Sequence, residues 1–266
     1  MSSVPAPRSA VGGFARGART VAEGAAVVAG GLVIWQLLAV FADSSVVPGP
    51  WPVAKAFWGA LDEGLATHTR VSAYRVVSAI ALAVATAAPL GVILGTNARL
   101  FTISAPVIYL SYPVPKIVLL PILLLFLGLG DQTKIAMIAI ILFFQILILV
   151  RDDVRSVRPE LVLSVRSLGA GWFGLMRHVY IPASLPGLFS ALRVSTGVAI
   201  AVLFFVESFG TREGLGYYIL VESWGRLEYP EMYAGVVAMA MLGLSLYYVL
   251  DGMERRICRW TRVGQR

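Results

Sequence analysis

The chain has 266 residues, of which 58% are hydrophobic and 14% charged, and it carries a formal net charge of +7. A soluble domain has roughly 25% charged residues, so this composition excludes an ordinary soluble globule and indicates a membrane protein with several spans. The one cysteine, Cys258, excludes an intramolecular disulfide and a cysteine metal site, and basic residues scattered between apolar runs exclude a nucleic-acid interface.

Six stretches are long and apolar enough to cross the roughly 30 Å of hydrocarbon in a bilayer, which takes about 17 to 25 residues. They are residues 22–41, 74–95, 104–129, 134–150, 187–206 and 233–250. We therefore expect an all-α membrane protein. Its six-helix domain, residues 22–253, lies between an N-terminal tail, 1–21, and a basic C-terminal tail, 254–266.

The third stretch is irregular, because Pro106, Pro113, Pro115 and Pro121 each remove a backbone donor. Such breaks persist at membrane depth only where protein or a water-filled cavity satisfies the freed backbone groups. The third stretch is therefore predicted to be kinked and to face the interior of the bundle.

The basic residues predict the orientation of the chain. Most of the 22 Lys and Arg residues lie in the two tails and in the loops that join spans two to three and four to five. By the positive-inside bias, both termini and the loop between spans four and five are cytoplasmic. The apolar run near the N-terminus exceeds that of a cleaved signal, so we expect a multi-pass protein of a bacterial plasma (inner) membrane.

The loop between spans four and five is too polar to span and too apolar for a linker. From Pro159 to Leu168 the apolar residues recur at helical spacing, which predicts a short amphipathic helix. Gly169 follows it as a C-cap glycine. A second short helix, Trp172 to Val179, is predicted to close at Ile181 and Pro182. Two such helices form a knob that another protein can bind.

An alternative interpretation of this loop is an amphipathic segment on lipid headgroups, which Arg166 and Arg177 would favour. A headgroup helix has no need of the spacing from Gly169 to Pro182, and that spacing supports the protein-binding interpretation.

The loop resembles the cytoplasmic signature of permeases of ATP-binding-cassette (ABC) importers: Glu-Ala-Ala, three residues, Gly, nine residues, then Ile-x-Leu-Pro. Here nine residues separate Gly169 from Val179, and Tyr180, Ile181 and Pro182 follow. The acidic start differs, because residues 163–165 read Leu-Ser-Val. This departure removes the Glu that would pair with the ATPase.

Two further segments resemble the nitrate, sulfonate, taurine and bicarbonate permease group. Residues 112–116 read YPVPK and lead through Leu120-Pro121 to the GLG of 128–130, and residues 207–210 read ESFG before the GLGY of 214–217. The resemblance implies a type I ABC importer-like permease fold. It also implies a cytoplasmic ATPase dimer, a second copy of the chain and an extracytoplasmic solute-binding protein as partners.

The resemblance assigns coupling to the ATPase to eight residues: Arg166, Ser167, Leu168, Gly169, Ala170, Val179, Ile181 and Pro182. The chain contains no phosphate-binding Gly-x-x-x-x-Gly-Lys-Ser/Thr loop, so we expect it to bind no cofactor, with ATP and magnesium used by the separate ATPase.

Seven residues are candidates for the translocation pathway: Tyr109, Tyr112, Pro113, Pro115, Lys116, Gln145 and Glu207. Alternatives stay open for several of them. Lys116 could counter an anionic solute or snorkel to an interface. Gln145 could bond a solute or join helices. Glu207 could face a partner or cavity, or lie solvated above the headgroups.

Two rival functions find little support in the sequence. A membrane-embedded hydrolase lacks its motifs, because neither Gly-x-Ser-x-Gly nor His-Glu-x-x-His occurs and both histidines lie outside the spans. A secondary transporter would show broken helices at matching positions in two halves, whereas only the third span is broken. The expected solute is a small anion such as nitrate, taurine or an alkanesulfonate, and a thiamine-precursor pyrimidine or other small metabolite is the alternative.

Overall fold

The computed structural model describes residues 11–111 and 113–262, and throughout this part of the chain the regular elements are helical. The all-α prediction is confirmed. The α-helices are α1 Val11–Ala42, α2 Pro50–Ala60, α3 Ala66–Thr96, α4 Ala98–Ser111, α5 Leu120–Leu127, α6 Asp131–Arg155, α7 Pro159–Ser167, α8 Trp172–Leu175, α9 Ile181–Glu207, α10 Leu215–Tyr217 and α11 Tyr229–Ile257.

Within the described residues, five continuous helical stretches are long and apolar enough to cross a membrane. They are Glu23–Ala42, Pro50–Thr96, Asp131–Arg155, Trp172–Glu207 and Tyr229–Ile257. A sixth crossing is reached if the bent pair Ala98–Ser111 and Lys116–Leu127, inclined at 82°, counts as one span. Each predicted stretch has a helical counterpart, and the observed helices extend further because polar residues continue the turns beyond the apolar core.

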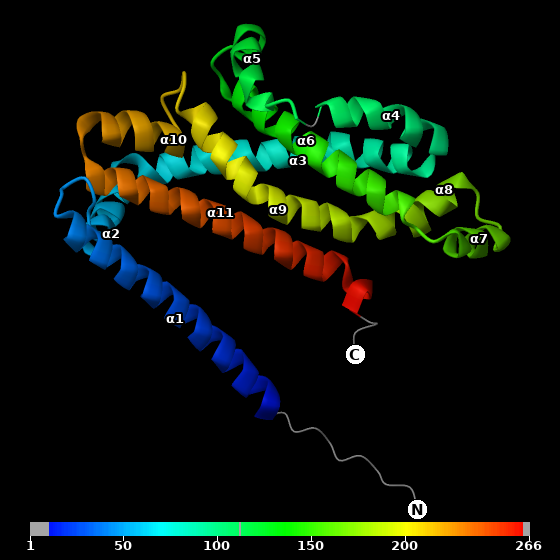
Figure 1. Cartoon of the computed structure of the whole chain (residues 1–266), viewed down its shortest axis with the longest axis horizontal. Helices are drawn as coiled ribbons and strands as arrows, with labels where there is room; N and C mark the ends of the chain where they lie inside the picture. The colour runs from blue at the N-terminus through cyan, green and yellow to red at the C-terminus, as the bar shows by residue number, and fades with distance from the viewer. Residues whose placement is uncertain (1–10, 112, 263–266) are drawn as a thin grey trace, which may run out of the picture.

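Helices α3, α6, α9 and α11 lie side by side and form the bundle (Figure 1). Helix α6 packs between α3 and α9, and small residues allow α3 to approach it closely. A Cβ atom at Gly95 would lie 2.6 Å from the Arg151 carbonyl oxygen, and one at Gly91 would lie 2.9 Å from the Val150 side chain. The core is therefore built around a crossing at which the two backbones nearly touch.

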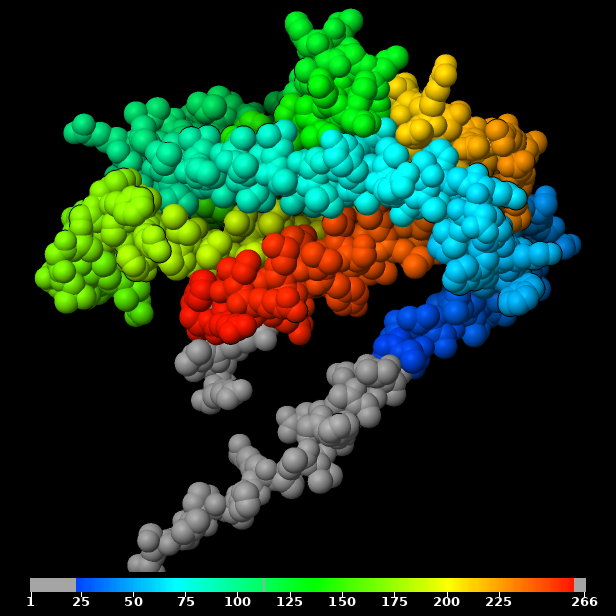
Figure 2. Space-filling model, turned by 180° about the vertical axis from the view of Figure 1, so that it is seen from behind, coloured from blue at the N-terminus to red at the C-terminus, as the bar shows by residue number. Residues whose placement is uncertain are grey.

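Helix α1 stands apart from this bundle in both overall views (Figures 1 and 2). Its span Glu23–Ala42 has no buried residue. Contacts near its C-terminal end join it to the rest of the chain. Among them, Trp35 stacks on Tyr233 with ring centroids 6.1 Å apart, and Trp35 Nε1 donates to the Pro48 carbonyl at 3.1 Å.

The short helices lie at opposite ends of the bundle. Helices α7 and α8 project at one end, and α2 and α10 cover the other (Figure 1). Since α7 and α8 belong to the loop predicted to be cytoplasmic, α2 and α10 belong to the predicted external face.

The third predicted span differs from expectation in two respects. Its break lies between α4 and Lys116, whereas Pro106 lies inside α4 and Pro121 in the first turn of α5, where a missing N–H is tolerated. The prediction that this stretch faces the bundle interior is wrong for the single chain: Leu110 is 76% exposed and Leu125 85%. Helices α4 and α5 flank the bundle, with an apolar surface left open.

Candidate functional site

Helix α7 begins and ends as its sequence predicts. Pro159 lies in its first turn, where the lost N–H has no partner in any helix, and Glu160 and Arg166 complement the dipole at its two ends. Gly169 has φ +85°, its N–H donates to the Arg166 carbonyl at 2.9 Å, and the Ala170 N–H donates to the Val165 carbonyl at 3.3 Å. This pair of bonds is a Schellman motif, so Gly169 caps the helix in the left-handed conformation that glycine adopts without strain.

The second short helix differs from the prediction. Ile181 and Pro182 do not close it, because α8 continues through a π turn, Met176–Tyr180, directly into α9. The wider turn lets the Ile181 N–H bond the Met176 carbonyl five residues back, and Pro182 then occupies a position that needs no donor. The result is one helical stretch from Trp172 to Glu207. Val179 is buried at its base, and Pro182 is half-buried.

The tip of this segment is apolar and open. Leu168 is 86% exposed and Phe173 is 76% exposed, whereas Val162 and Val165 turn inward and are half-buried. Arg166, Ser167 and Gly169 are exposed beside Leu168. An apolar knob rimmed by polar residues is typical of a surface that another protein covers.

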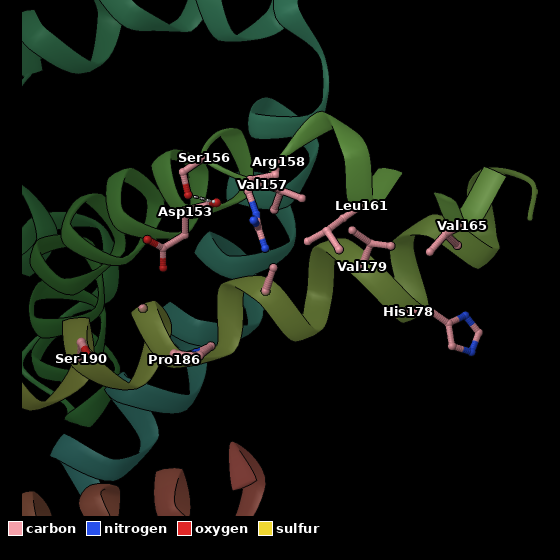
Figure 3. A pocket seen from close by; sticks show the side chains of 12 residues that line it. Asp153, Ser156, Val157, Arg158, Leu161, Val165, His178, Val179, Pro186 and Ser190 are labelled. Atoms are coloured by element: carbon pink, nitrogen blue, oxygen red, sulfur yellow. Dashed lines mark hydrogen bonds between the residues drawn. The ribbon is translucent and has the colours of Figure 1, made fainter. Parts of the chain in front are cut away.

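Two cavities flank α7 at its base. One of about 540 Å³ lies between the end of α6, α7 and the start of α9, with Asp153, Arg158 and His178 among its lining residues (Figure 3). The other, of about 600 Å³, lies on the side of α3 and is lined by Gly95, Arg155 and Tyr180, among others. Helix α7 therefore has open space on both sides, and it packs on α8 and on the turn Met176–Tyr180.

A buried charged network at the opposite end of the bundle escaped the sequence interpretation. The Glu207 carboxylate is completely buried; Arg75 Nη1 donates to its Oε1 at 2.8 Å, and the Gly216 N–H donates to its Oε2 at 3.0 Å. Ser72 Oγ lies 2.8 Å from Oε2. Arg75, 3% exposed, also donates to Asp131 Oδ1 through Nε at 2.8 Å.

The same network holds the loop that follows α9. Arg75 Nη1 donates to the Glu213 carbonyl at 2.8 Å, and His68 Nδ1 accepts the Gly214 N–H at 3.0 Å. Gly214 has φ +119°, and a Cβ at Gly216 would lie 2.4 Å from the Phe204 carbonyl oxygen. The network thus joins α3, α6 and α9 to the 208–216 loop at one end of the molecule.

The structure places Glu207 in different surroundings from Lys116 and Gln145. Lys116 lies at the break, where its Nζ donates to the Ser111 carbonyl at 3.0 Å and lies 4.7 Å from the centroid of the Phe144 ring. Gln145 follows Phe144 on α6, and its buried Oε1 has no hydrogen-bond donor among the described residues. Glu207, by contrast, has no exposed surface and belongs to the charged network.

The remaining pathway candidates lie around the same break. Tyr109 is 68% exposed on α4, and Pro113 and Pro115 are exposed in the segment before Lys116. Tyr112 lies outside the described residues. The pathway roles of all seven residues stay predictions.

Comparison with known proteins gives consistent results. The family model described as "Binding-protein-dependent transport system inner membrane component" matches residues 87–263. A putative ABC transporter permease protein of Methanocaldococcus jannaschii is 32% identical over 240 residues, 87% of this chain and 89% of the relative. The taurine transport system permease protein of Escherichia coli is 29% identical over 203 residues, 76% of this chain and 73% of the relative.

Two further similarities extend the comparison. The riboflavin transport system permease protein of Chloroflexus aurantiacus is 32% identical over 234 residues, 86% of both chains. Among solved structures, a chain of the MetNI methionine ABC transporter in an inward-facing conformation superposes with a TM-score of 0.61 at 20% identity, covering 74% of this chain and 97% of that one. At this identity the superposition shows a shared fold.

Proposed function

Because the chain belongs to the family of binding-protein-dependent transport system inner membrane components, the membrane permeases of ABC importers, we propose that it couples to its ATPase through residues 159–182. As a permease, the chain carries a small solute across the membrane and catalyses no reaction itself. The observation that supports the coupling proposal is the exposed apolar tip at Leu168, presented by a helix that Gly169 caps.

The segment suits a docking role for physical reasons. Its tip exposes Leu168 beside Gly169 and the half-buried Ala170, so an ATPase surface could approach the backbone closely. Leu-Ser-Val stands where related permeases carry Glu-Ala-Ala, so apolar contact would supply binding free energy that an ion pair supplies elsewhere.

The transmission of force would follow the continuous helix from Trp172 to Glu207. Closure of two ATPase subunits would move the tip. The helix would carry this displacement toward the Arg75–Glu207 network, because its α9 part packs against α6. A second copy of the chain would complete the pathway, and an extracytoplasmic solute-binding protein would deliver the solute at the α2–α10 end. In this arrangement both termini are cytoplasmic.

The coupling proposal is tested by ATP-driven uptake in proteoliposomes that contain the chain with its ATPase and solute-binding protein. Gly169→Val should reduce uptake about tenfold, because a β-branched residue in the left-handed region costs roughly 1–2 kcal/mol. Gly169→Asn should retain uptake, because Asn tolerates that region.

The matched control is Gly171→Val, which adds the same side chain two residues away, where φ is −74° and no atom lies within 4 Å of the new Cβ. Normal uptake by Gly169→Val would count against coupling through this segment. Uptake by the chain without an ATPase would contradict the importer role itself.

For the solute we propose a small anion such as nitrate, taurine or an alkanesulfonate. The similarity to the taurine permease supports this class. The similarity to the riboflavin permease favours a second candidate, a heteroaromatic metabolite such as a thiamine-precursor pyrimidine. A thermal-shift screen of the cognate solute-binding protein separates the two, because the bound solute stabilises the native state.

A further inference from the structure

The break between α4 and α5 places a positive charge near the middle of the membrane. Lys116 Nζ lies over the Phe144 ring. Phe144 lies about 20 Å along α6 from Asp131 and about 17 Å from Arg155, at about 1.5 Å per residue. Since Asp131 and Arg155 mark the two ends of α6, the ammonium group lies close to mid-depth of the span.

No carboxylate among the described residues pairs with this ammonium group. Its contacts are neutral: the Ser111 carbonyl at 3.0 Å and the face of Phe144. Two other cations pair with carboxylates, Arg75 with Glu207 and Asp131, and Arg193 with Asp251 and Glu254. Lys134 also donates to backbone carbonyls, those of Leu129 and Gly130, but it lies in the first turn of α6 and not at mid-depth. An ionisable group at membrane depth without a counter-ion is costly and generally marks an ion or substrate path.

The backbone beside Lys116 also requires water or protein at this depth. Pro113, Val114 and Pro115 are non-helical and exposed on the single chain. Irregular backbone is not stable against lipid, because its carbonyl groups would lack donors. The face around residues 113–116 therefore borders an aqueous path or a second protein chain.

From these observations we propose that Lys116 forms an anion-binding subsite at mid-depth of the pathway and sets the preference for negatively charged solutes. This inference rests on the permease pathway proposed above and adds to it the residue that selects charge. The solute class is a small anion whose charged group pairs with Lys116.

The experiment uses charged thiol reagents as probes, so it needs no identified solute. Val114, 49% exposed and two residues from Lys116, is replaced by cysteine in the full chain, in which the buried Cys258 is replaced by alanine. In leaky membrane vesicles, the rates of modification by an anionic and a cationic methanethiosulfonate of similar size are compared. Their ratio reports the local potential at position 114.

Adding Lys116→Met should lower the anionic-to-cationic rate ratio about tenfold. A unit charge roughly 6 Å away changes the local concentration of each reagent about threefold in water, in opposite directions. Lys116→Arg should keep the ratio. The matched control is Lys55→Met, which removes the same charge from an exposed position on α2 and should leave the ratio unchanged.

A ratio that Lys116→Met leaves unchanged would overturn the proposal, and so would an introduced thiol at position 114 that neither reagent modifies. The measurement requires no ATP and no partner. ATP-driven uptake by the wild-type chain together with an unchanged ratio would therefore refute the subsite alone, whereas the absence of uptake would refute the importer role.

Discussion

The Arg75–Glu207 pair offers the sharpest test of how the external end is held together. Arg75→Met would leave the Glu207 carboxylate completely buried, with bonds from Ser72 and Gly216 but without its cation. Removing one partner of a buried ion pair costs about 3–5 kcal/mol. At roughly 2–4 °C per kcal/mol for a chain of this size, the apparent melting temperature should fall by on the order of 10 °C.

The assay is thermal unfolding of the detergent-solubilised chain, followed by loss of the monodisperse peak in size-exclusion chromatography. The matched control is Arg212→Met in the same loop, where the side chain is exposed and the expected shift is within about 2 °C. Replacing both partners, Arg75→Met with Glu207→Leu, should restore part of the loss, because no buried carboxylate is left without a cation and Asp131, which also loses Arg75, is 46% exposed. If Arg75→Met unfolded at the temperature of Arg212→Met, the ion pair would not stabilise this end.

Three further outcomes are expected. Gly95→Ala should destabilise the chain by about 1–3 kcal/mol in thermal unfolding, because the new Cβ would overlap the α6 backbone. Gly59→Ala on α2, where no atom lies within 4 Å of the new Cβ, should not. Leu168→Asp should leave the melting temperature unchanged, because the side chain is 86% exposed, yet abolish co-purification with the ATPase. Gly216→Ala should lower the melting temperature by displacing the loop from the α9 backbone, whereas Gly225→Ala, with open space around its Cβ, should have little effect.

Features determined by neighbouring residues could be predicted from the sequence. The six apolar stretches have helical counterparts, and the cap at Gly169 follows from helical periodicity that stops at a glycine. Both signals are local, because helix length and the left-handed C-cap depend on residues within a few positions of each other.

The charged network at the external end could not be predicted in the same way. Arg75 and Glu207 are separated by 132 positions, and their pairing depends on how α3 and α9 pack on α6. The sequence nonetheless contained a signal: Arg75, Asp131 and Glu207 lie near the ends of three predicted spans, on the same predicted side of the membrane. Opposite charges at one membrane depth usually pair.

The helix end at Pro182 was mispredicted for a different reason. A proline normally ends or kinks a helix because it lacks an N–H. Nothing in the residue pattern predicted the π turn at Met176–Tyr180, in which the Ile181 N–H bonds the Met176 carbonyl and the helix continues. Which sides of α4 and α5 are exposed could not be predicted from a single sequence either. Apolar residues have the same composition whether they face lipid, a second copy of the chain or a protein core.

The position of α1 has a consequence for biogenesis. Helix α1 precedes the other described spans in the chain, yet the ring on which Trp35 stacks, Tyr233, belongs to α11. During insertion the Trp35–Tyr233 contact can therefore form only after α11 has been synthesised, and until then most of the α1 surface faces acyl chains. The described span of α1 has no buried residue. Its apolar helical surface is already solvated by the bilayer, so α1 is stable before it packs against the rest of the chain.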